Sequence, residues 1–348
     1  MQDDGRRHRN ARTPVMSDVG KVAGVSHQTV SRVINGSPKV RPETRQRVLA
    51  AMHELGYRPN SVARALATGR TNMLGVVGFD TTLYGPASVL FGIERAAHEE
   101  GYLMIVASLK ALNRASVVDA IDRLRIRGVD GVVVIAPDLE AADAVRQTHR
   151  DIPLVAAEAG PSDVISVVAV DQFAGAVSAT RHLLDLGHET VWHISGPAEW
   201  LESAERVDGW RTALESAGAT PPPLLVGDWS ARAGYDLGRR LSTNRSVTAI
   251  FAANDQMALG VLRAMREAGR DVPADVSVVG FDDIPEAPYF NPPLTTVRQD
   301  FIEVGSRSLR VLVRAIETGE PAVQGSLVAT ELIVRESTAV PRQTITQS

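Results

Sequence analysis

Residues 15–56 read VMSDVGKVAGVSHQTVSRVINGSPKVRPETRQRVLAAMHELG. Apolar residues recur in this stretch at helical spacing, and turn-forming residues separate three such runs. Gly24 supplies a tight turn after the first run, and Ser26 is placed to cap the second. Pro42 opens the third run, which Gly56 ends. The stretch therefore predicts a helix, a turn and two further helices around one small core made of Met16, Val19, Val22, Ala23, Val30, Val33, Ile34, Val48, Leu49, Met52 and Leu55.

The charge of the chain is divided unevenly. Residues 1–70 carry 13 Lys and Arg against 5 Asp and Glu, whereas the whole chain carries 37 against 41. Because each Lys or Arg placed on DNA releases condensed counterions, a cationic segment of this size is a candidate for phosphate binding. A solvated basic face is the other interpretation. Residues 1–14, rich in Arg, are predicted to form a disordered basic arm.

Composition excludes several classes of protein. With 348 residues, 44% of them hydrophobic, the chain has the composition of a soluble globular protein of about two domains. No apolar run approaches the roughly 20 residues of a membrane span, and the first residues lack the apolar stretch of a secretory signal. We therefore expect a cytoplasmic protein without membrane contact. The absence of cysteine removes thiol catalysis, disulfides and thiolate metal sites.

Sequence signatures of an enzyme are missing as well. The chain has no GxxxxGK[ST] phosphate loop, no GxGxxG after a strand, no nucleophile elbow and no HExxH motif. The eight histidines are dispersed, and none makes a persuasive acid–base pair with a carboxylate. We therefore expect no catalysis, no metal and no cofactor.

From Asn72 onward, β-branched runs alternate with amphipathic stretches. This alternation predicts parallel sheets covered by helices on both faces, arranged as two doubly wound halves with a ligand crevice at the strand ends. The predicted strands are 74–79, 103–107, 131–135, 154–157, 165–170, 191–194, 224–226, 249–252 and 276–281. The predicted helices are 87–100, 115–127, 139–149, 173–186, 203–217, 232–242, 256–268 and 302–317.

The second short helix has a polar face suited to a DNA major groove. Its apolar residues face the small core, which leaves His27, Gln28, Ser31 and Arg32 on the opposite side. Gln can form a bidentate pair with adenine and Arg with guanine. Short polar side chains suit phosphate oxygens, and we assign that role to Thr29, Ser31, Asn35, Thr44 and Asn60. The alternative is the polar outer face of any three-helix module.

Three motifs carry a family resemblance. They are GVSHQTVSRVINGSPKVRPETRQRVLAAMHELGYRPNSVARALATG at 24–69, AANDQMALG at 252–260 and VSVVGFDDIPEAPYFNPPLTTVRQDF at 276–301. Together they resemble the lac repressor family of bacterial transcription regulators over nearly the whole chain. The resemblance implies a homodimer in which each headpiece reads half of a near-palindrome of double-stranded operator DNA. It also implies a core like that of periplasmic sugar-binding proteins.

Particular residues follow from this resemblance. It makes His27, Gln28 and Arg32 the base readers, and Leu66 an apolar wedge that enters the minor groove and kinks the DNA. The alternative for Leu66 is a simple packing residue of the hinge helix. His27 replaces the family's tyrosine, so the bases read there differ. Val15 stands where a threonine would cap the first helix, and Gly20 replaces a better helix former.

The resemblance also suggests a division of the chain. We expect a helix-turn-helix headpiece at 15–59 and a hinge helix at 60–70, too short to be stable alone. The core, 71–340, binds the effector and the second subunit. Its N-subdomain comprises about 71–171 and 302–328, its C-subdomain about 172–298 and 329–340, and 341–348 form a tail. Because the tail lacks leucine heptads, a dimer is favoured over a tetramer.

A small saccharide is the expected effector. A sugar needs charged or amide groups that bond its hydroxyls, and an aromatic plate for its C–H face. Arg206, Asn254 and Asp282 are the leading hydroxyl ligands, with Trp229 and Phe301 as aromatic walls. Positions implied by the resemblance also include Leu83, Pro86, Val89, Glu158 and Gln299, with Glu158 replacing an aspartate.

Each of these effector residues has an ordinary alternative. Arg206 and Asp282 could form a surface ion pair. Asn254 or Asp282 could cap the following helix, and Trp229 could be a core residue. A galactoside is the saccharide that the resemblance favours.

The preferred hypothesis is a repressor of a carbohydrate-utilisation operon that a saccharide releases from its operator. An order–disorder change of the hinge helix would couple DNA binding to closure of the distant cleft. A co-repressor response, in which the ligand tightens DNA binding, is the alternative within the family. A sugar-binding protein without DNA function and a cytoplasmic sugar-modifying enzyme are the alternatives from other classes.

Overall fold

The structure is a computed structural model that describes residues 14–34, 36–58, 65, 69–79, 82–109, 113–136, 145, 152–319 and 325–342. The chain forms two compact units, Met1–Thr71 and Asn72–Ser348, each with its own core. No helix in the described part of the chain is long and apolar enough to cross a membrane.

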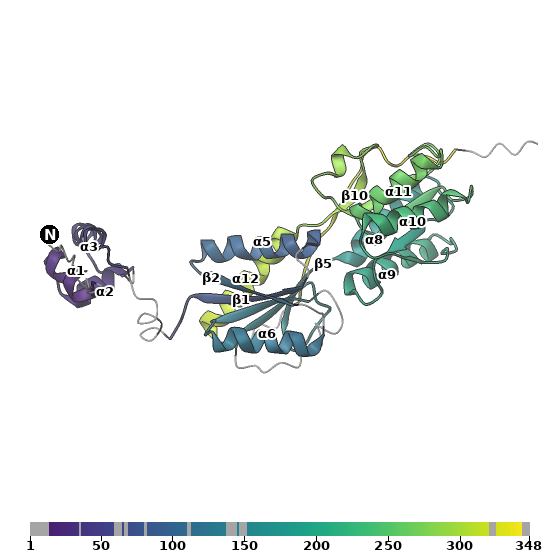
Figure 1. Ribbon diagram of the computed structural model, residues 1–348. Helices are drawn as coiled ribbons and strands as arrows, with labels where there is room; N and C mark the ends of the chain where they lie inside the picture. Colours follow the sequence, from purple (N-terminus) through teal and green to yellow (C-terminus); the bar gives the residue numbers. More distant parts are fainter. Residues whose placement is uncertain are drawn as a thin grey trace, which may run out of the picture. The chain divides into compact units, whose positions relative to one another are not determined.

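The first unit is the predicted three-helix module (Figure 1). Its helices are α1 (Met16–Ala23), α2 (His27–Ile34) and α3 (Pro42–Glu54). The Ser26 hydroxyl accepts a hydrogen bond from the Thr29 amide, with 3.3 Å between Oγ and N, which confirms the predicted cap of α2. One buried cluster joins the three helices, and it consists of Val19, Ala23, Val30, Val33, Val48, Ala51 and Tyr57.

Two residues expected in this core are instead exposed. Val22 keeps 47% and Leu49 keeps 51% of its accessible surface. Each lies about 100° around its helix from the buried residue beside it, Ala23 or Val48. Because the module is small, each helix buries only a narrow stripe, and the neighbouring apolar side chain stays in solvent.

Gly20, which we expected to weaken α1 as a poor helix former, has a packing role. The turn after α1 folds back so that the Val25 amide donates to the Gly20 carbonyl oxygen, with 2.9 Å between N and O. A Cβ atom at Gly20 would lie 2.8 Å from the Val25 oxygen, closer than real contacts allow. The expectation considered helix propensity alone, and this close backbone approach outweighs it.

The second unit begins with a lobe built on a six-stranded parallel sheet. We call it the first lobe. Its strands are β1 (Met73–Phe79), β2 (Leu103–Leu109), β3 (Gly131–Ile135), β4 (Leu154–Ala157), β5 (Ser166–Val170) and β11 (Gly325–Val328). They lie in the order β2-β1-β3-β4-β5-β11. Figure 1 shows α5 (Tyr84–Glu99) and α6 (Arg114–Ile126) on opposite faces of this sheet, and α12 (Phe301–Thr318) packs beside α5.

The second lobe repeats this design. Its strands are β6 (Trp192–Ser195), β7 (Leu225–Val226), β8 (Ala249–Ala252), β9 (Ser277–Asp282), β10 (Thr295–Arg298) and β12 (Glu331–Ile333). They lie in the order β7-β6-β8-β9-β10-β12, with β12 antiparallel to β10 and the others parallel. Its helices are α8 (Gln172–Asp185), α9 (Leu201–Ser216), α10 (Ala231–Ser242) and α11 (Asp255–Glu267), and a 3₁₀ turn spans Ala287–Tyr289.

Side chains alternate between the two faces of the second sheet. Ile250 and Ala252 point to the cluster under α10 and α11, while Ala249 and Phe251 point to the cluster under α8 and α9. Both sheets reverse strand order next to their first strand, as doubly wound sheets do. The predicted fold class, a helix-turn-helix unit followed by two parallel-sheet α/β lobes, is thereby confirmed.

Three short strands escaped the sequence prediction: β10, β11 and β12. The sequence of β10, TTVR, carries no apolar run, and β11 and β12 lie at sheet edges and are partly exposed. These segments are short and carry no continuous apolar run, so only their pairing with a neighbouring strand identifies them as strands. The predicted helix 139–149 lies outside the described residues except Val145.

Candidate functional site

The first unit presents the polar face of α2 to solvent. His27, Gln28 and Arg32 are exposed, whereas Val30 and Val33 of the same helix are buried. Since all three exposed side chains can donate or accept hydrogen bonds, this face has the chemistry that reads base edges in a major groove.

The structure describes only three of the five side chains that we expect to contact phosphates. Thr29, Ser31 and Thr44 are partly buried, and Thr29 Oγ1 lies 3.1 Å from Ser26 Oγ. Asn35, Asn60 and Leu66 lie outside the described residues, as does most of the predicted hinge helix.

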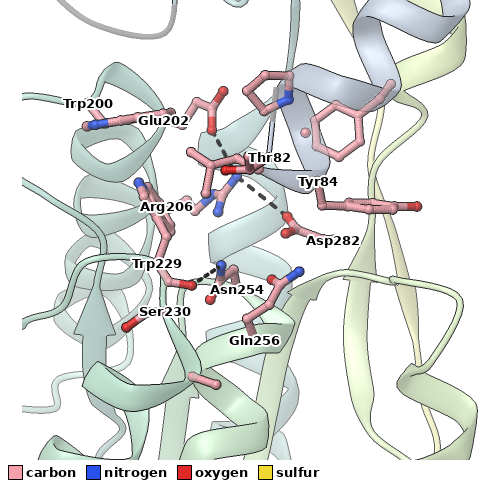
Figure 2. Close-up of a pocket in the computed structure, with 15 residues that line it drawn as sticks. Thr82, Tyr84, Trp200, Glu202, Arg206, Trp229, Ser230, Asn254, Gln256 and Asp282 are labelled. Atoms are coloured by element: carbon pink, nitrogen blue, oxygen red, sulfur yellow. Dashed lines mark hydrogen bonds and ion pairs between the residues drawn. The ribbon is translucent and has the colours of Figure 1, made fainter. Parts of the chain in front are cut away.

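The second unit contains a cavity of about 240 Å³ between its lobes (Figure 2). Of the residues predicted to bind an effector, this cavity brings together Leu83, Pro86, Arg206, Trp229, Asn254, Asp282 and Phe301. Most of them follow the carboxyl ends of parallel strands or begin the next helix, where doubly wound sheets place their ligands.

Three predicted effector residues lie behind the cavity wall. Val89 is fully buried in the core of the first lobe. Glu158 is buried and accepts a hydrogen bond from the Val170 amide, with 3.4 Å between N and Oε2. Gln299 is buried and donates to Asp282, with 2.6 Å between Nε2 and Oδ1.

Arg206 occupies the centre of the wall, and only 2% of it is exposed. Its Nη2 lies 3.5 Å from Glu202 Oε2 and 4.0 Å from Asp282 Oδ1, and its Nη1 donates to the Ala253 carbonyl. The guanidinium carbon also lies 4.1 Å from the centre of the Phe281 ring, a favourable cation–π distance. These contacts contradict the interpretation of Arg206 and Asp282 as surface ion-pair partners.

The wall therefore holds two carboxylates against one guanidinium. Burial raises the pKa of Asp282 well above its usual range, although Arg206 opposes this shift. Burial likewise raises the pKa of Glu202, again against the attraction of Arg206. Buried acceptors of this kind bind hydroxyl donors strongly because water does not compete for them.

Two wall residues have a backbone conformation that non-glycine residues avoid. Trp229 has a φ of 70° and Asp282 a φ of 114°. Such conformations cost about 1–3 kcal/mol each and persist where the surrounding structure requires them, often at ligand sites. The strain therefore supports a binding role for both side chains.

Asn254 both caps a helix, which was the alternative predicted for it, and lines the cavity. Its Oδ1 accepts from the Met257 amide at 2.9 Å, which caps α11, and its Nδ2 donates to the Trp229 carbonyl at 3.0 Å. Asn254 thus fixes the backbone that carries Trp229 while lining the cavity.

The sequence prediction missed several wall residues. Trp200 and Glu202 stand just before Arg206, and the Trp200 ring lies edge-on to that of Trp229, with 5.7 Å between their centres. The spacing of Glu202 and Arg206, four residues apart on one helix, was the available signal. The other missed wall residues are Thr82, Tyr84, Gly85, Ser230, Ala231 and Gln256.

Catalytic chemistry gains no support from this geometry. Among the described residues, no group of acidic and histidine side chains could hold a metal ion. Burial lowers the pKa of His193 to about 3, so this core histidine is a neutral imidazole near neutral pH, and its one N–H donates to the Phe251 carbonyl oxygen, with 2.9 Å between Nδ1 and O. The cavity has the features of a binding site.

Comparisons with known proteins agree with both units. The family model for bacterial regulatory proteins of the lacI family matches residues 15–60, and the model of a periplasmic binding protein-like domain matches residues 180–338. The lactose operon repressor of Escherichia coli (strain K12) is 33% identical over 326 residues, which cover 93% of this chain and 90% of that repressor.

Solved structures show the same likeness. The lac repressor dimer bound to operator and the anti-inducer ONPF matches with a TM-score of 0.85 at 32% identity, covering 94% of this chain and 100% of that one. A complex of the transcriptional regulator CelR with cellobiose matches with a TM-score of 0.70 at 32% identity, covering 93% and 99%. The chain therefore belongs to the lacI family of bacterial regulatory proteins and is a DNA-binding transcriptional repressor, not an enzyme.

Proposed function

We propose that this repressor controls a carbohydrate-utilisation operon and that a small saccharide, bound in the cavity between the lobes, releases it from operator DNA. The observation that carries the proposal is the buried arrangement of Arg206, Asp282 and Asn254 beside the ring of Trp229. Charged and amide groups that converge next to an aromatic face match the hydroxyls and the C–H face of a pyranose.

Two relatives support the saccharide class. The CelR structure contains cellobiose, and the first-named relative represses a lactose operon. The family resemblance implies that Arg206, Trp229, Asn254 and Asp282 agree with a galactoside binder, and on this ground we propose a galactoside. Gln299 supports this wall from behind through its hydrogen bond to Asp282, whereas Val89 and Glu158 are buried and do not line the cavity.

Calorimetric titration with lactose, galactose and cellobiose tests the effector. We expect a galactoside to bind with measurable heat, and binding of cellobiose alone would replace the galactoside by a glucoside. Titration with and without operator duplex then tests the coupling, since a saccharide that weakens operator binding must itself bind more weakly to the operator complex. Equal affinities would contradict release, and tighter saccharide binding with operator present would establish the co-repressor alternative.

The DNA-reading residues form the second part of the proposal. His27, Gln28 and Arg32 read base edges, Leu66 wedges the minor groove at the operator centre, and Thr29, Ser31, Asn35, Thr44 and Asn60 contact phosphates. Two subunits read a near-palindrome, as befits the dimeric state of the lac repressor structure that this chain resembles. Light scattering that shows a stable four-chain particle would contradict the dimer.

Substitution of Arg32 sharpens this assignment. Arg32→Ala removes one bidentate base contact from each half-site, and it is expected to lower discrimination between operator and scrambled duplex by about 30-fold or more, corresponding to roughly 1–3 kcal/mol for each of the two contacts. Arg47→Ala, an exposed arginine on α3, is the matched control and should leave the ratio nearly unchanged. Fluorescence anisotropy at several salt concentrations measures both ratios, and equal losses in the two variants would reject Arg32 as a base reader.

A further inference from the structure

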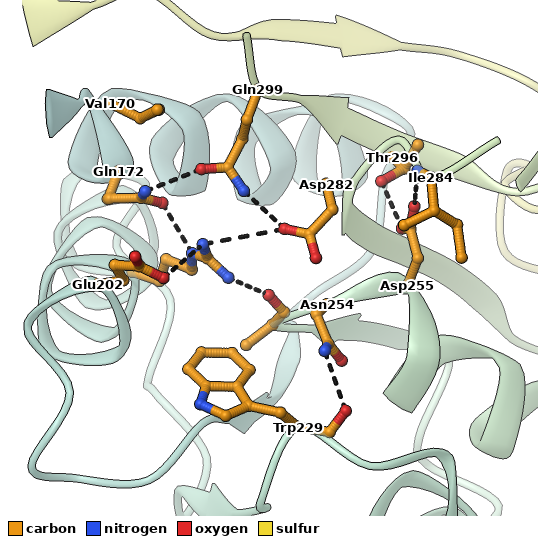
Figure 3. Close-up of polar contacts among 12 residues, drawn as sticks. Val170, Gln172, Glu202, Trp229, Asn254, Asp255, Asp282, Ile284, Thr296 and Gln299 are labelled. Carbon is orange, nitrogen blue, oxygen red and sulfur yellow. Dashed lines mark hydrogen bonds and ion pairs between the residues drawn. The ribbon is translucent and has the colours of Figure 1, made fainter. Parts of the chain in front are cut away.

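A chain of hydrogen bonds runs behind the cavity wall from Arg206 to Asp282 (Figure 3). Arg206 Nε donates to Gln172 Oε1 at 2.8 Å, Gln172 Nε2 donates to Gln299 Oε1 at 2.8 Å, and Gln299 Nε2 donates to Asp282 Oδ1 at 2.6 Å. All four side chains are buried, with exposed fractions of 2%, 1%, 6% and 8% in that order. Water therefore does not substitute for any link.

The chemistry of its ends gives this chain one direction. A guanidinium N–H only donates, so the oxygen of the Gln172 amide must face Arg206 and its nitrogen must face Gln299. The same reasoning then places the Gln299 oxygen toward Gln172 and its nitrogen toward Asp282. Because Asp282 Oδ1 accepts the last hydrogen, each amide uses its acceptor on one side and its donor on the other.

The two glutamines lie where the polypeptide passes from one lobe to the other. Gln172 is the first residue of α8, two residues after β5 of the first lobe. Gln299 follows β10 of the second lobe and precedes α12 of the first. Neither is among the residues that line the cavity, whereas Arg206 and Asp282 both are.

We propose that Gln172, acting with Gln299, is a positioning residue that orients Arg206 and Asp282 toward the saccharide and ties both to the crossovers between the lobes. The inference rests on the proposed function, because Arg206 and Asp282 are its leading saccharide ligands. It gives a direct route by which a saccharide that moves either end of the chain acts on two of the connections around which the lobes close.

The direction of the chain makes a one-atom test possible. In Gln172→Glu the carboxylate still accepts from Arg206, but its second oxygen faces the oxygen of Gln299. If the Gln299 amide flips to donate to residue 172, its oxygen then faces Asp282, so with both carboxyls ionised one buried pair of acceptors remains in either case. We expect the unfolding midpoint to fall by several degrees, on the order of 5 °C.

A second substitution should restore the chain in the opposite direction. In Gln172→Glu/Asp282→Asn, the amide introduced at position 282 can donate to Gln299. Gln299 then donates to the carboxylate introduced at position 172, which also accepts from Arg206. The double variant has the same net charge and number of heavy atoms as the wild type, and the carboxylate has only changed position. We expect its midpoint to lie above that of Gln172→Glu, whereas a midpoint at or below that of Gln172→Glu would overturn the directional chain.

Saccharide titration of the folded full-length protein tests the positioning role. With whichever of lactose and cellobiose binds the wild type, Gln172→Glu should bind at least 10-fold more weakly at 20 °C, well below its midpoint. Gln46→Glu, an exposed Gln-to-Glu control on α3, should bind like the wild type. An unchanged affinity in Gln172→Glu would reduce the chain to a structural role and overturn the proposal.

These measurements separate the two proposals from each other. If neither saccharide binds the wild type, the proposed function fails, while the comparison of midpoints still decides whether the directional chain exists. If a saccharide binds the wild type and binds Gln172→Glu equally well, the function stands and the positioning role fails.

Discussion

The two lobes of the core share a strand order but contribute different chemistry to the cavity. Among the lining residues that the structure describes, the charged side chains Glu202, Arg206 and Asp282 all belong to the second lobe. The first lobe contributes a largely apolar surface made of Thr82, Leu83, Tyr84, Gly85, Pro86 and Phe301. Under the proposed function, the second lobe would hold the saccharide's polar groups, while the first lobe would cover the saccharide and exclude water.

Replacement of Arg206 should have the largest effect. Arg206→Ala leaves two buried carboxylates without their cation, and we expect saccharide affinity to fall by more than 100-fold. Operator affinity should stay within about threefold of wild type, because the exposed face of α2 does not involve this residue.

Operator binding measured with and without saccharide checks this prediction. Arg206→Lys is the milder variant for the case in which Arg206→Ala does not fold, and it should bind more weakly than wild type because Lys lacks the fork geometry. A fully inducible Arg206→Ala protein would remove the cavity as the effector site.

A buried carboxyl group of the second lobe, Asp255, should make the stability of the protein depend on pH. Burial raises the pKa of Asp255 to about 7, since its hydrogen bonds from Thr296 and the Ile284 amide only partly compensate. A carboxyl whose pKa is higher in the folded than in the unfolded state favours folding when protonated. That stability is complete below the unfolded value near 4 and is lost as the pH rises toward 7.

Asp255→Asn isolates this contribution. The variant keeps both hydrogen-bond positions, with the amide oxygen toward Ile284 and the amide nitrogen toward the Thr296 hydroxyl. Wild type is expected to lose roughly 3 kcal/mol more unfolding free energy than Asp255→Asn between pH 4 and pH 8. Urea unfolding at the two pH values measures this, and parallel profiles for the two proteins would show that Asp255 titrates normally.

A substitution in the first lobe should have a smaller effect, limited to the lifetime of the protein–saccharide complex. Leu83 lies on the cavity wall and also packs against the core cluster of the second lobe. Leu83→Ala is expected to raise the saccharide dissociation rate about 10-fold with little change in the association rate, because it loosens the cover and leaves the polar ligands intact.

Stopped-flow measurements separate the two rates of Leu83→Ala. If Leu83→Ala lowered saccharide affinity as much as Arg206→Ala, the two lobes would contribute equally to binding, which would contradict the proposed difference between them.

Periodicity predicted the headpiece well because its contacts are local. Spacing along each helix identified Val19, Val30 and Val33 as core residues, and a capping side chain located the start of α2. It failed for Val22 and Leu49, since spacing indicates a face of a helix but does not say how wide a stripe the partner helices cover.

The cavity was harder to predict than the headpiece, because many of its contacts join residues far apart in the sequence. The resemblance pointed to Arg206 and Asp282, and the four-residue spacing of Glu202 and Arg206 was a local signal that the prediction did not use. Nothing local indicated that Glu158 would lie behind the wall. The short strands β10 and β12 were equally invisible, because pairing with a neighbouring strand defines them.

The amino-acid sequence by itself determined the two-unit plan, the polar face of α2 and the α/β character of the core, because these depend on residue type and on contacts between near neighbours. The tertiary structure alone decided that Asp282 joins Glu202 at Arg206 and how Gln172 and Gln299 connect Arg206 to Asp282. Those contacts join residues as far as 127 positions apart, and only the packing of two folded lobes brings them together.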